Sequence, residues 1–228
     1  MGIIVQGGKT VIGRRRPSST PTLNPIWDTL THAYNADNNS LDQKGTSNGT
    51  LVGGTTYVSG VIGQAFQGDG INDCVIFSDN AWDITTDFTF SIWFKVNANS
   101  PDAFPLIIWD GTQGLAVYEL DGTYRVWYNG FANAIVIGSG SFSSVKHHLA
   151  VTLIGTEFKI YLDNSLISTQ TLTLCTASTY KCGLLCNPYA NNYFYNGWVD
   201  IPLFFSSGLN STQVAELYNS GNGLQYPN

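Results

Sequence analysis

The sequence predicts an all-β protein in which two antiparallel sheets form a sandwich, with one short C-terminal helix and an extended N-terminal arm. The main observation is that apolar residues recur at every second position, most clearly in residues 88–96 (FTFSIWFKV). The composition agrees, because 24 Gly, 12 Tyr, 12 Phe and 6 Trp accompany only 11% charged residues. Such a composition is typical of sheets joined by tight turns.

The clearest succession of strands lies in residues 145–172. Residues 148–153 and 158–162 predict two strands, and residues 166–169 begin a third. Asp163 and Asn164 form the second connecting turn, since short polar residues tolerate the left-handed backbone that a two-residue hairpin requires. No helical spacing interrupts this stretch, so it predicts an antiparallel meander.

Other segments extend the sheets along the chain. Asp121-Gly122 is a strong hairpin signal between expected strands at 115–120 and 124–128. Pro202 cannot donate a backbone hydrogen bond and therefore predicts an edge position or a bulge. The one predicted helix covers residues 209–218, capped by Asn210 or Ser211 and stopped by Gly221. Further strands are expected at 30–34, 106–109, 181–186 and 193–201.

Several of these segments resemble the laminin-G-like, concanavalin A-type jelly rolls. Residues 147–152 (HHLAVT) and 159–164 (KIYLDN) are similar to the two central strands of that family, although Lys146 and Asn164 replace its usual Trp and Gly. Residues 60–75 (GVIGQAFQGDGINDCV) are similar to its most specific motif, with Cys74 where the family prefers Tyr. The resemblance implies a two-sheet antiparallel jelly-roll sandwich within residues 26–228 and a small, buried, apolar role for Cys74.

Charge divides the chain into an arm, residues 1–25, and a body, residues 26–228. The arm has no acidic residue and a charge of +4, whereas the body carries −10. An acidic body disfavours nucleic acid as the partner of the folded domain. The arm is either a disordered tail or a docking segment that adds strands to another subunit or lays its arginines on an acidic surface. Its basic residues are Lys9, Arg14, Arg15 and Arg16.

The start of the chain and the cysteines bear on its compartment. The first residues (MGIIVQGG) lack the basic start and long apolar run of a signal peptide, and no stretch reaches the roughly 20 apolar residues of a membrane span. A chain without a leader favours a reducing compartment. Three interpretations of the cysteines stay open: reduced, partly buried thiols; a disulfide among Cys175, Cys182 and Cys186; or a metal site, for which the Cys182–Cys186 spacing is a poor match.

Glycoside hydrolysis, which some proteins of this architecture perform, is disfavoured by the acidic residues. A retaining mechanism needs two carboxylates about 5 Å apart, and Glu occurs only at positions 119, 157 and 216. The candidate strand at 199–202 offers Asp200 alone. The adjacent His147 and His148 are expected to have a structural role, with one ring facing the core and one facing out. The sequence therefore predicts a protein that is not an enzyme.

Calcium and glycans are the expected ligands. The resemblance implies a structural Ca²⁺ site on Asp200, with Asp37, Asp42 and Asp69 near it, because oxygen ligands from separate loops suit this ion. Exposed aromatic rings can stack on sugars while amide side chains bond to hydroxyl groups. We expect this surface at the Asn-rich loop, whereas Trp109, Tyr118 and Tyr128 fit a core better. The candidate sugar-binding residues are Tyr189, Asn191, Asn192, Tyr193, Tyr195 and Trp127.

Together these features predict a non-enzymatic structural or adhesion protein. Leaderless chains with an arm and such a jelly roll resemble the head-decoration and tail-fibre components of bacteriophages, which implies a place in a virion assembled in the host cytoplasm. The arm would bind other virion subunits, and the body would contact neighbouring copies, as a homo-oligomer or part of a larger assembly, or glycans. The alternative is a free carbohydrate-binding module at a cell surface or outside the cell.

Overall fold

The structure is a computed structural model that describes residues 24–98, 102–130, 134–139, 142, 145–176 and 179–227. The predicted anchoring residues Lys9, Arg14, Arg15 and Arg16 lie outside the described residues, so their role stays a prediction. The described part opens with the short 3-10 helix η1 (Pro25–Thr29).

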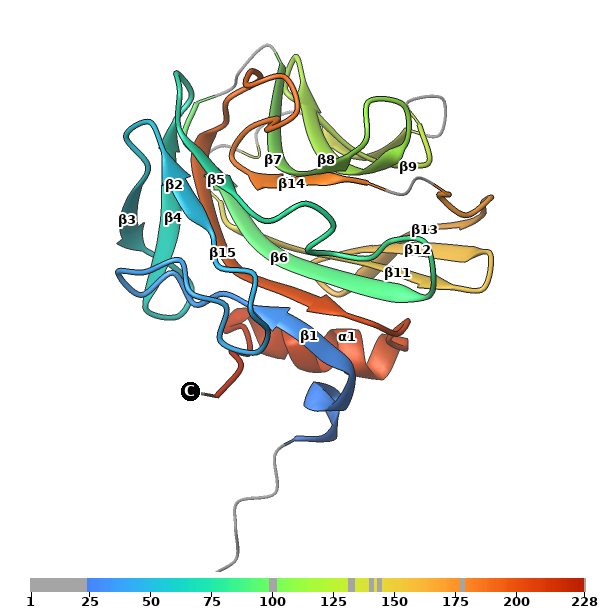
Figure 1. The fold of residues 1–228 in the computed structure, drawn as a ribbon. Helices are drawn as coiled ribbons and strands as arrows, with labels where there is room; N and C mark the ends of the chain where they lie inside the picture. The colour runs from blue at the N-terminus through green and yellow to red at the C-terminus, as the bar shows by residue number, and fades with distance from the viewer. Residues whose placement is uncertain are drawn as a thin grey trace, which may run out of the picture.

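Two antiparallel sheets form a sandwich, as the alternation predicts (Figure 1). The first, called the β6 sheet here, has the strand order β13-β12-β11-β6-β15-β4-β3, and β1 also pairs with β15. The second, the β8 sheet, has the order β10-β9-β8-β7-β14-β5-β2. The β6 sheet comprises β1 (Leu30–Ala33), β3 (Thr56–Ser59), β4 (Gln64–Asp69), β6 (Phe88–Val96), β11 (His147–Ile154), β12 (Glu157–Leu162), β13 (Ser165–Thr171) and β15 (Asn196–Phe205). The β8 sheet comprises β2 (Thr50–Val52), β5 (Cys74–Ile76), β7 (Asp102–Trp109), β8 (Gly114–Leu120), β9 (Thr123–Tyr128), β10 (Ile135–Ser139) and β14 (Lys181–Leu184).

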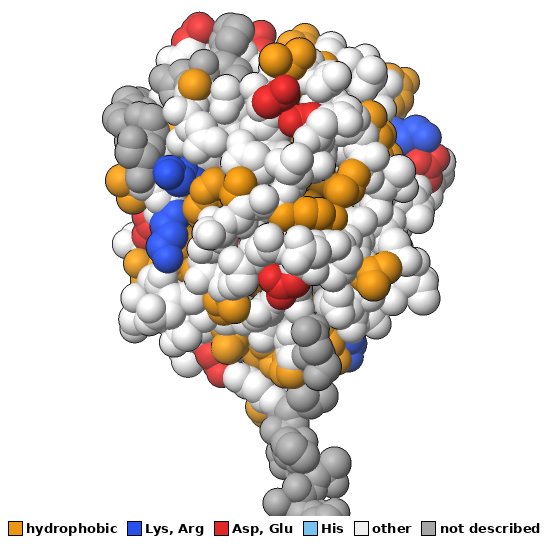
Figure 2. All heavy atoms as spheres, turned by 90° about the vertical axis from the view of Figure 1, so that its left-hand side faces the viewer, with side chains coloured by type: hydrophobic (Ala, Val, Ile, Leu, Met, Phe, Trp, Pro, Cys, Tyr) orange, Lys and Arg blue, Asp and Glu red, His pale blue; other side chains and the backbone are white. Residues whose placement is uncertain are grey.

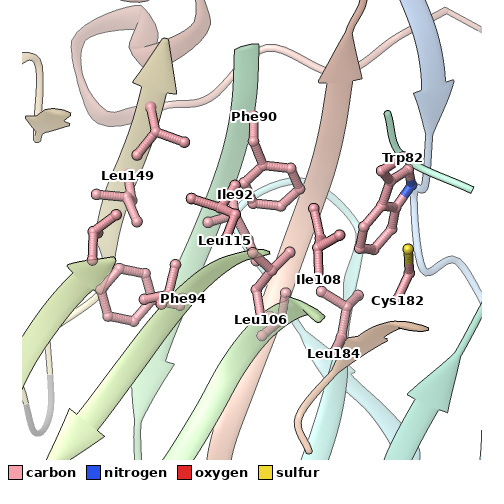
Figure 3. Packing of buried hydrophobic residues seen from close by; sticks show 14 of the residues in the cluster. Trp82, Phe90, Ile92, Phe94, Leu106, Ile108, Leu115, Leu149, Cys182 and Leu184 are labelled. Atoms are coloured by element: carbon pink, nitrogen blue, oxygen red, sulfur yellow. The ribbon is translucent and has the colours of Figure 1, made fainter. Parts of the chain in front are cut away.

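The main hydrophobic core fills the space between the two sheets. In Figure 3, Phe90, Ile92 and Phe94 of β6 lie in one packed layer with side chains of the β8 sheet. Burying a side chain of this size contributes roughly 1.5–3 kcal/mol. The expected alternation of β6 is confirmed, because all five of its predicted inward residues belong to this core: Phe88, Phe90, Ile92, Phe94 and Val96.

The outer face of the β6 sheet is covered by a second apolar cluster. Trp93, which alternates with the inward residues of β6, packs there with Trp27 from η1 and with Val214 and Leu217. The last two come from helix α1 (Ser211–Tyr218), which lies beside β1 on this side of the molecule (Figure 1). Within the described residues, no helix covers the corresponding outer face of the β8 sheet.

The ends of α1 partly match the sequence prediction. Asn210 is the N-cap: its side chain accepts from the backbone N–H of Gln213, and the Gln213 side chain accepts from that of Asn210. The prediction that Gly221 stops the helix is wrong. Asn219 already adopts the left-handed conformation with φ 47°, which Asn tolerates better than most residues, and the helix ends at Tyr218.

The predicted turns and bulge are confirmed. Asp163 and Asn164 have φ values of 48° and 65°, which fit a two-residue hairpin turn between β12 and β13. The pairing of β15 with β6 shifts register between Asp200 and Leu203, so Pro202 lies at a bulge.

The expectation of reduced, buried thiols holds for two of the four cysteines, whereas the observed disulfide was not among the suggested pairings. Cys74 and Cys186 form a disulfide, with Cα atoms 5.2 Å apart and a separation of 112 positions in the chain. They meet because β5 pairs with β14, which places Val75 opposite Leu184. Cys74 is buried as expected, but bonded to Cys186 rather than present as a thiol. The free cysteines, Cys175 and Cys182, are both buried in the main core.

Candidate functional site

The outer face of the β8 sheet is where side chains suited to ligand binding gather. On β8 and β9, Val117 and Val126 point into the core, so their neighbours Tyr118 and Arg125 lie on the outer face. Figure 2 shows a different side of the molecule, formed by β2, β3 and β4, where apolar side chains occur in separate groups among uncharged polar atoms.

Five side chains on the outer face, here called the aromatic row, follow one another across the strands. The ring of Phe104 on β7 lies 4.9 Å from that of Tyr118 and 5.7 Å, edge-on, from that of Tyr193. Tyr118 is directly opposite Arg125, and Arg125 is directly opposite Val136 on β10. The row therefore runs Tyr193, Phe104, Tyr118, Arg125, Val136.

The row is held in place by hydrogen bonds and burial. The Tyr118 hydroxyl donates to Asp102 Oδ1 at 2.6 Å. Burial, together with this carboxylate, raises the pKa of Tyr118 above its ordinary value, so the phenol stays protonated. Phe104 is buried and forms the floor between the tyrosines, and its backbone N–H donates to the Tyr193 carbonyl at 3.2 Å. Tyr193 leaves 42% of its surface exposed, so part of its ring is available to a ligand.

The Asn-rich loop after β14 is closed by its own backbone. The N–H of Asn187 donates to the Asn192 carbonyl at 2.9 Å, and the Asn187 side chain accepts from the Tyr189 N–H at 3.0 Å. Tyr189 is 55% exposed and lies against Gly111, just beyond the end of β7. Tyr193 lies beside Phe104, near the start of the same strand. The two exposed tyrosines of the loop are therefore at opposite ends of β7.

The predicted sugar-binding residues do not form one surface. Trp127 is fully buried and packs edge-on against Trp109 at 4.7 Å. Tyr195 is fully buried in the main core. Neither ring has a face for a sugar, so the prediction is wrong for these two residues. Asn191 is exposed and Asn192 partly exposed, both in the loop that carries Tyr189 and Tyr193.

Phe104 and Asp102 were missed by the sequence analysis, and Tyr118 was assigned to the core. The alternation of β8 already separates Tyr118 from the inward Val117. Arg125 could have placed Tyr118 on the outer face. A cation is rarely buried between two sheets, and the Asp121-Gly122 hairpin sets Arg125 opposite Tyr118, so both side chains lie on the same face.

The four acidic residues of the expected calcium site lie in three places. Asp200 is fully buried and accepts from the backbone N–H groups of Val61 at 2.6 Å and Ile62 at 3.3 Å. Asp37 accepts from the N–H of Gln64 at 2.9 Å, so Asp37 and Asp200 hold the same turn. Burial raises the pKa of Asp200 to about 7, and the charge of Asp37 adds to this effect.

Asp42 and Asp69 serve other turns. Asp42 accepts from the N–H groups of Ala33, Lys44, Gly45 and Ser47, and Asp69 accepts from that of Ile71. Carboxylate oxygens surrounded by N–H donors have few lone pairs left for a cation. No group of three or more His, Cys, Asp or Glu in the described ranges could hold a metal ion. A calcium site on Asp37 and Asp200 remains a prediction.

The glutamates and histidines of the described residues are engaged in local contacts. Glu119 is buried and accepts from the Tyr124 hydroxyl at 3.1 Å, Glu157 pairs with Lys159, and Glu216 accepts from Asn24. These glutamates lie on β8, β12 and α1, so they do not share one strand.

The two histidines face different surroundings. His147 Nδ1 is 2.7 Å from Asp163 Oδ2, and its ring packs on Phe94 at the core side. The ring of His148 packs on Trp93 on the opposite side of the sheet, and its Nε2 is 2.8 Å from Ser91 Oγ. Burial lowers the pKa of His148 to about 4. Each ring therefore has a structural contact, as the sequence analysis expected.

Among the residues that the structure describes, no helix is both long and apolar enough to cross a bilayer.

Comparison with known proteins finds solved structures of similar fold. No curated protein sequence matches the chain. Domain 4 of AbnA, a GH43 extracellular arabinanase from Geobacillus stearothermophilus solved with arabinotriose, matches with a TM-score of 0.72 and 18% identity, over 86% of this chain and 98% of that domain. Two botulinum neurotoxin DC binding domains, in complex with SialylT and with rat synaptotagmin II, both match with a TM-score of 0.67, at 16% and 15% identity. Each match covers 86% of this chain and 52% of the toxin chain.

The sequence itself matches a family model over residues 68–215, which include β5 to β15 and most of α1. The motif in residues 60–75 and the central strands at 147–164 had indicated the same family. This chain belongs to the concanavalin A-like lectin/glucanases superfamily.

Proposed function

We propose that the chain is a non-catalytic recognition domain that binds a glycan through the aromatic row. The observation that carries the proposal is the pair Tyr118 and Tyr193, which stand partly exposed on either side of the buried Phe104 ring. Aromatic rings fixed in this way offer apolar surface to the faces of sugar rings with little loss of side-chain freedom. The Tyr118–Asp102 hydrogen bond fixes one of them before any ligand arrives.

The fold of this chain supports recognition of either a glycan or a protein. Among proteins of similar fold, domain 4 of AbnA was solved with arabinotriose and one toxin binding domain with synaptotagmin II. The aromatic row favours a glycan here, because it is a narrow line of rings rather than a broad apolar patch. Specific protein interfaces bury about 800 Å² on each partner.

The test combines a glycan array, which includes arabinotriose, with calorimetry on the glycans that bind. Tyr193→Ala and Tyr118→Ala should each weaken binding at least about tenfold, as expected for a central aromatic contact. Tyr189→Ala is the matched control, since this exposed tyrosine lies at the other end of β7. Equal losses in all three variants, or none in the first two, would place the ligand elsewhere.

A second proposal concerns the whole assembly and rests on the charge difference between the arm, +4, and the body, −10. We propose that residues 1–25 anchor the body to a larger particle such as a virion. A basic arm can dock on an acidic surface, such as the body of a neighbouring copy in the particle, and this docking would be sensitive to salt. Sedimentation of the full chain with particles from its source, and release when residues 1–25 are deleted, is the expected result. A full chain that stays in the supernatant contradicts the anchoring role.

A further inference from the structure

Arg125 occupies an unusual position in the aromatic row, between Tyr118 and Val136. It is the only arginine in residues 26–228, a body that otherwise carries a strong negative charge. Its side chain is partly buried, and its Nη1 atom is shielded from solvent and has no hydrogen-bond partner among the residues that the structure describes. None of the ion pairs formed by the described residues involves it. Buried donors of charged groups are usually satisfied, so this one calls for an explanation.

The residues next to Arg125 on the outer face are a tyrosine and an exposed apolar residue. Across the strands, Arg125 faces Tyr118 on one side and Val136, which is 52% exposed, on the other. Asp102, the carboxylate that touches the row, accepts a hydrogen bond from the Tyr118 hydroxyl. Glu119 and Tyr124, which come from the same two strands, point into the core on the opposite face of the sheet. The guanidinium therefore has no ion-pair partner among the described residues.

We propose that the ligand of the aromatic row is an acidic glycan whose carboxylate pairs with Arg125. This inference rests on the glycan-binding function proposed above and specifies the class of its ligand. A sugar stacked between Tyr193 and Tyr118 would present its next residue to Arg125, two strands away from Phe104. The planar guanidinium can donate two parallel N–H bonds to a carboxylate, which a neutral sugar cannot accept in the same way.

The experiment compares three probes by calorimetry: a uronic-acid trisaccharide, its methyl ester and a sulfated neutral trisaccharide. The free acid should bind at least about tenfold more tightly than the ester, the difference expected from charge-assisted hydrogen bonds. Arg125→Gln should remove this preference, so that the variant binds the free acid and the ester with equal affinity. Arg125→Lys should keep only part of the preference for the free acid, since an ammonium group lacks the two parallel N–H donors of the guanidinium. Lys159→Gln is the matched control, because it removes one positive charge from β12, on the other sheet.

The outcomes separate this inference from the proposed function. If the wild-type protein binds the acid and the ester equally while Tyr118→Ala loses both, the row binds glycans and the acidic ligand is wrong. A preference for the acid that survives in Arg125→Gln also overturns the inference. A preference for the sulfated probe over the free acid assigns Arg125 to sulfate and contradicts the carboxylate. If none of the three probes binds, the proposal of an acidic ligand is wrong. The proposal that the aromatic row binds glycans is rejected as well only if the neutral glycans of the array also fail to bind.

Discussion

Two buried titratable groups beside Trp93 predict how the stability of the protein depends on pH. Asp200 on β15 and His148 on β11 are each directly opposite Trp93 in the β6 sheet. Burial raises the pKa of Asp200 from 3.8 to about 7, because the charged form is poorly solvated. Burial also lowers the pKa of His148 from 6.5 to about 4, again because the charged form is disfavoured.

The two shifts act on stability with opposite signs. Between pH 3.8 and 7 the folded protein keeps a proton on Asp200 that the unfolded chain has released. The contribution of Asp200 to the free energy of unfolding is therefore complete below pH 3.8 and is lost as the pH rises through 7. A shift of about 3 units corresponds to about 4 kcal/mol. The contribution of His148 is complete above pH 6.5 and is lost as the pH falls through 4, which corresponds to about 3 kcal/mol. The two slopes should nearly cancel between pH 4 and 6.5.

Urea unfolding across about pH 4 to 8 should reveal each slope in a variant that lacks the other group. As the pH is lowered from 6.5 to 4, the free energy of unfolding of Asp200→Asn should fall by about 3 kcal/mol. That of His148→Gln, which keeps a group to pair with Ser91, should rise by about as much over the same interval. Asp28→Asn is the control, because this carboxylate is exposed on η1 and its removal changes net charge alone. Parallel profiles for Asp200→Asn and the wild-type protein would refute the reasoning.

Three further predictions concern the disulfide, the calcium site and the helix cap. Replacing Cys74 and Cys186 by alanine should lower the free energy of unfolding by about 2–5 kcal/mol, and an unchanged urea midpoint would contradict this. If Asp37 and Asp200 bind Ca²⁺, excess Ca²⁺ should raise the melting temperature of the wild-type protein but not of Asp200→Asn. If calorimetry shows no heat of Ca²⁺ binding and the melting temperature does not rise, the site is absent. Asn210→Ala should cost about 1 kcal/mol by removing the cap of α1, whereas Ser211→Ala, beside it, should cost much less in the same unfolding assay.

The strands were predictable because their signal is local. A two-residue period in 88–96 or 148–153 depends only on neighbouring residues, and so do the turns at Asp163 and Asp121. The Cys74–Cys186 bond was not predictable in this way, since it depends on which strands become neighbours across 112 positions.

The candidate site was predicted only in part for a related reason. Alternation separates the two faces of a strand, but it does not tell which outer residues another segment will cover. Tyr193 was correctly placed at the surface, whereas Trp127 lies on the outer face of β9 and is nevertheless buried beside Trp109. Tyr118 has the same sequence pattern as its buried neighbours, and only its pairing with Arg125 and Asp102 distinguishes it.

The Cys74–Cys186 bond has a consequence beyond stability, because of where Cys186 lies. It directly precedes Asn187, whose pairing with Asn192 closes the loop that carries Tyr193 to the aromatic row. Reduction of the disulfide would release the N-terminal end of this loop while leaving the inner core residues in place. The affinity of the aromatic row for its ligand would then depend on the redox conditions. The same chain would bind more slowly or more weakly in a reducing medium than in an oxidising one.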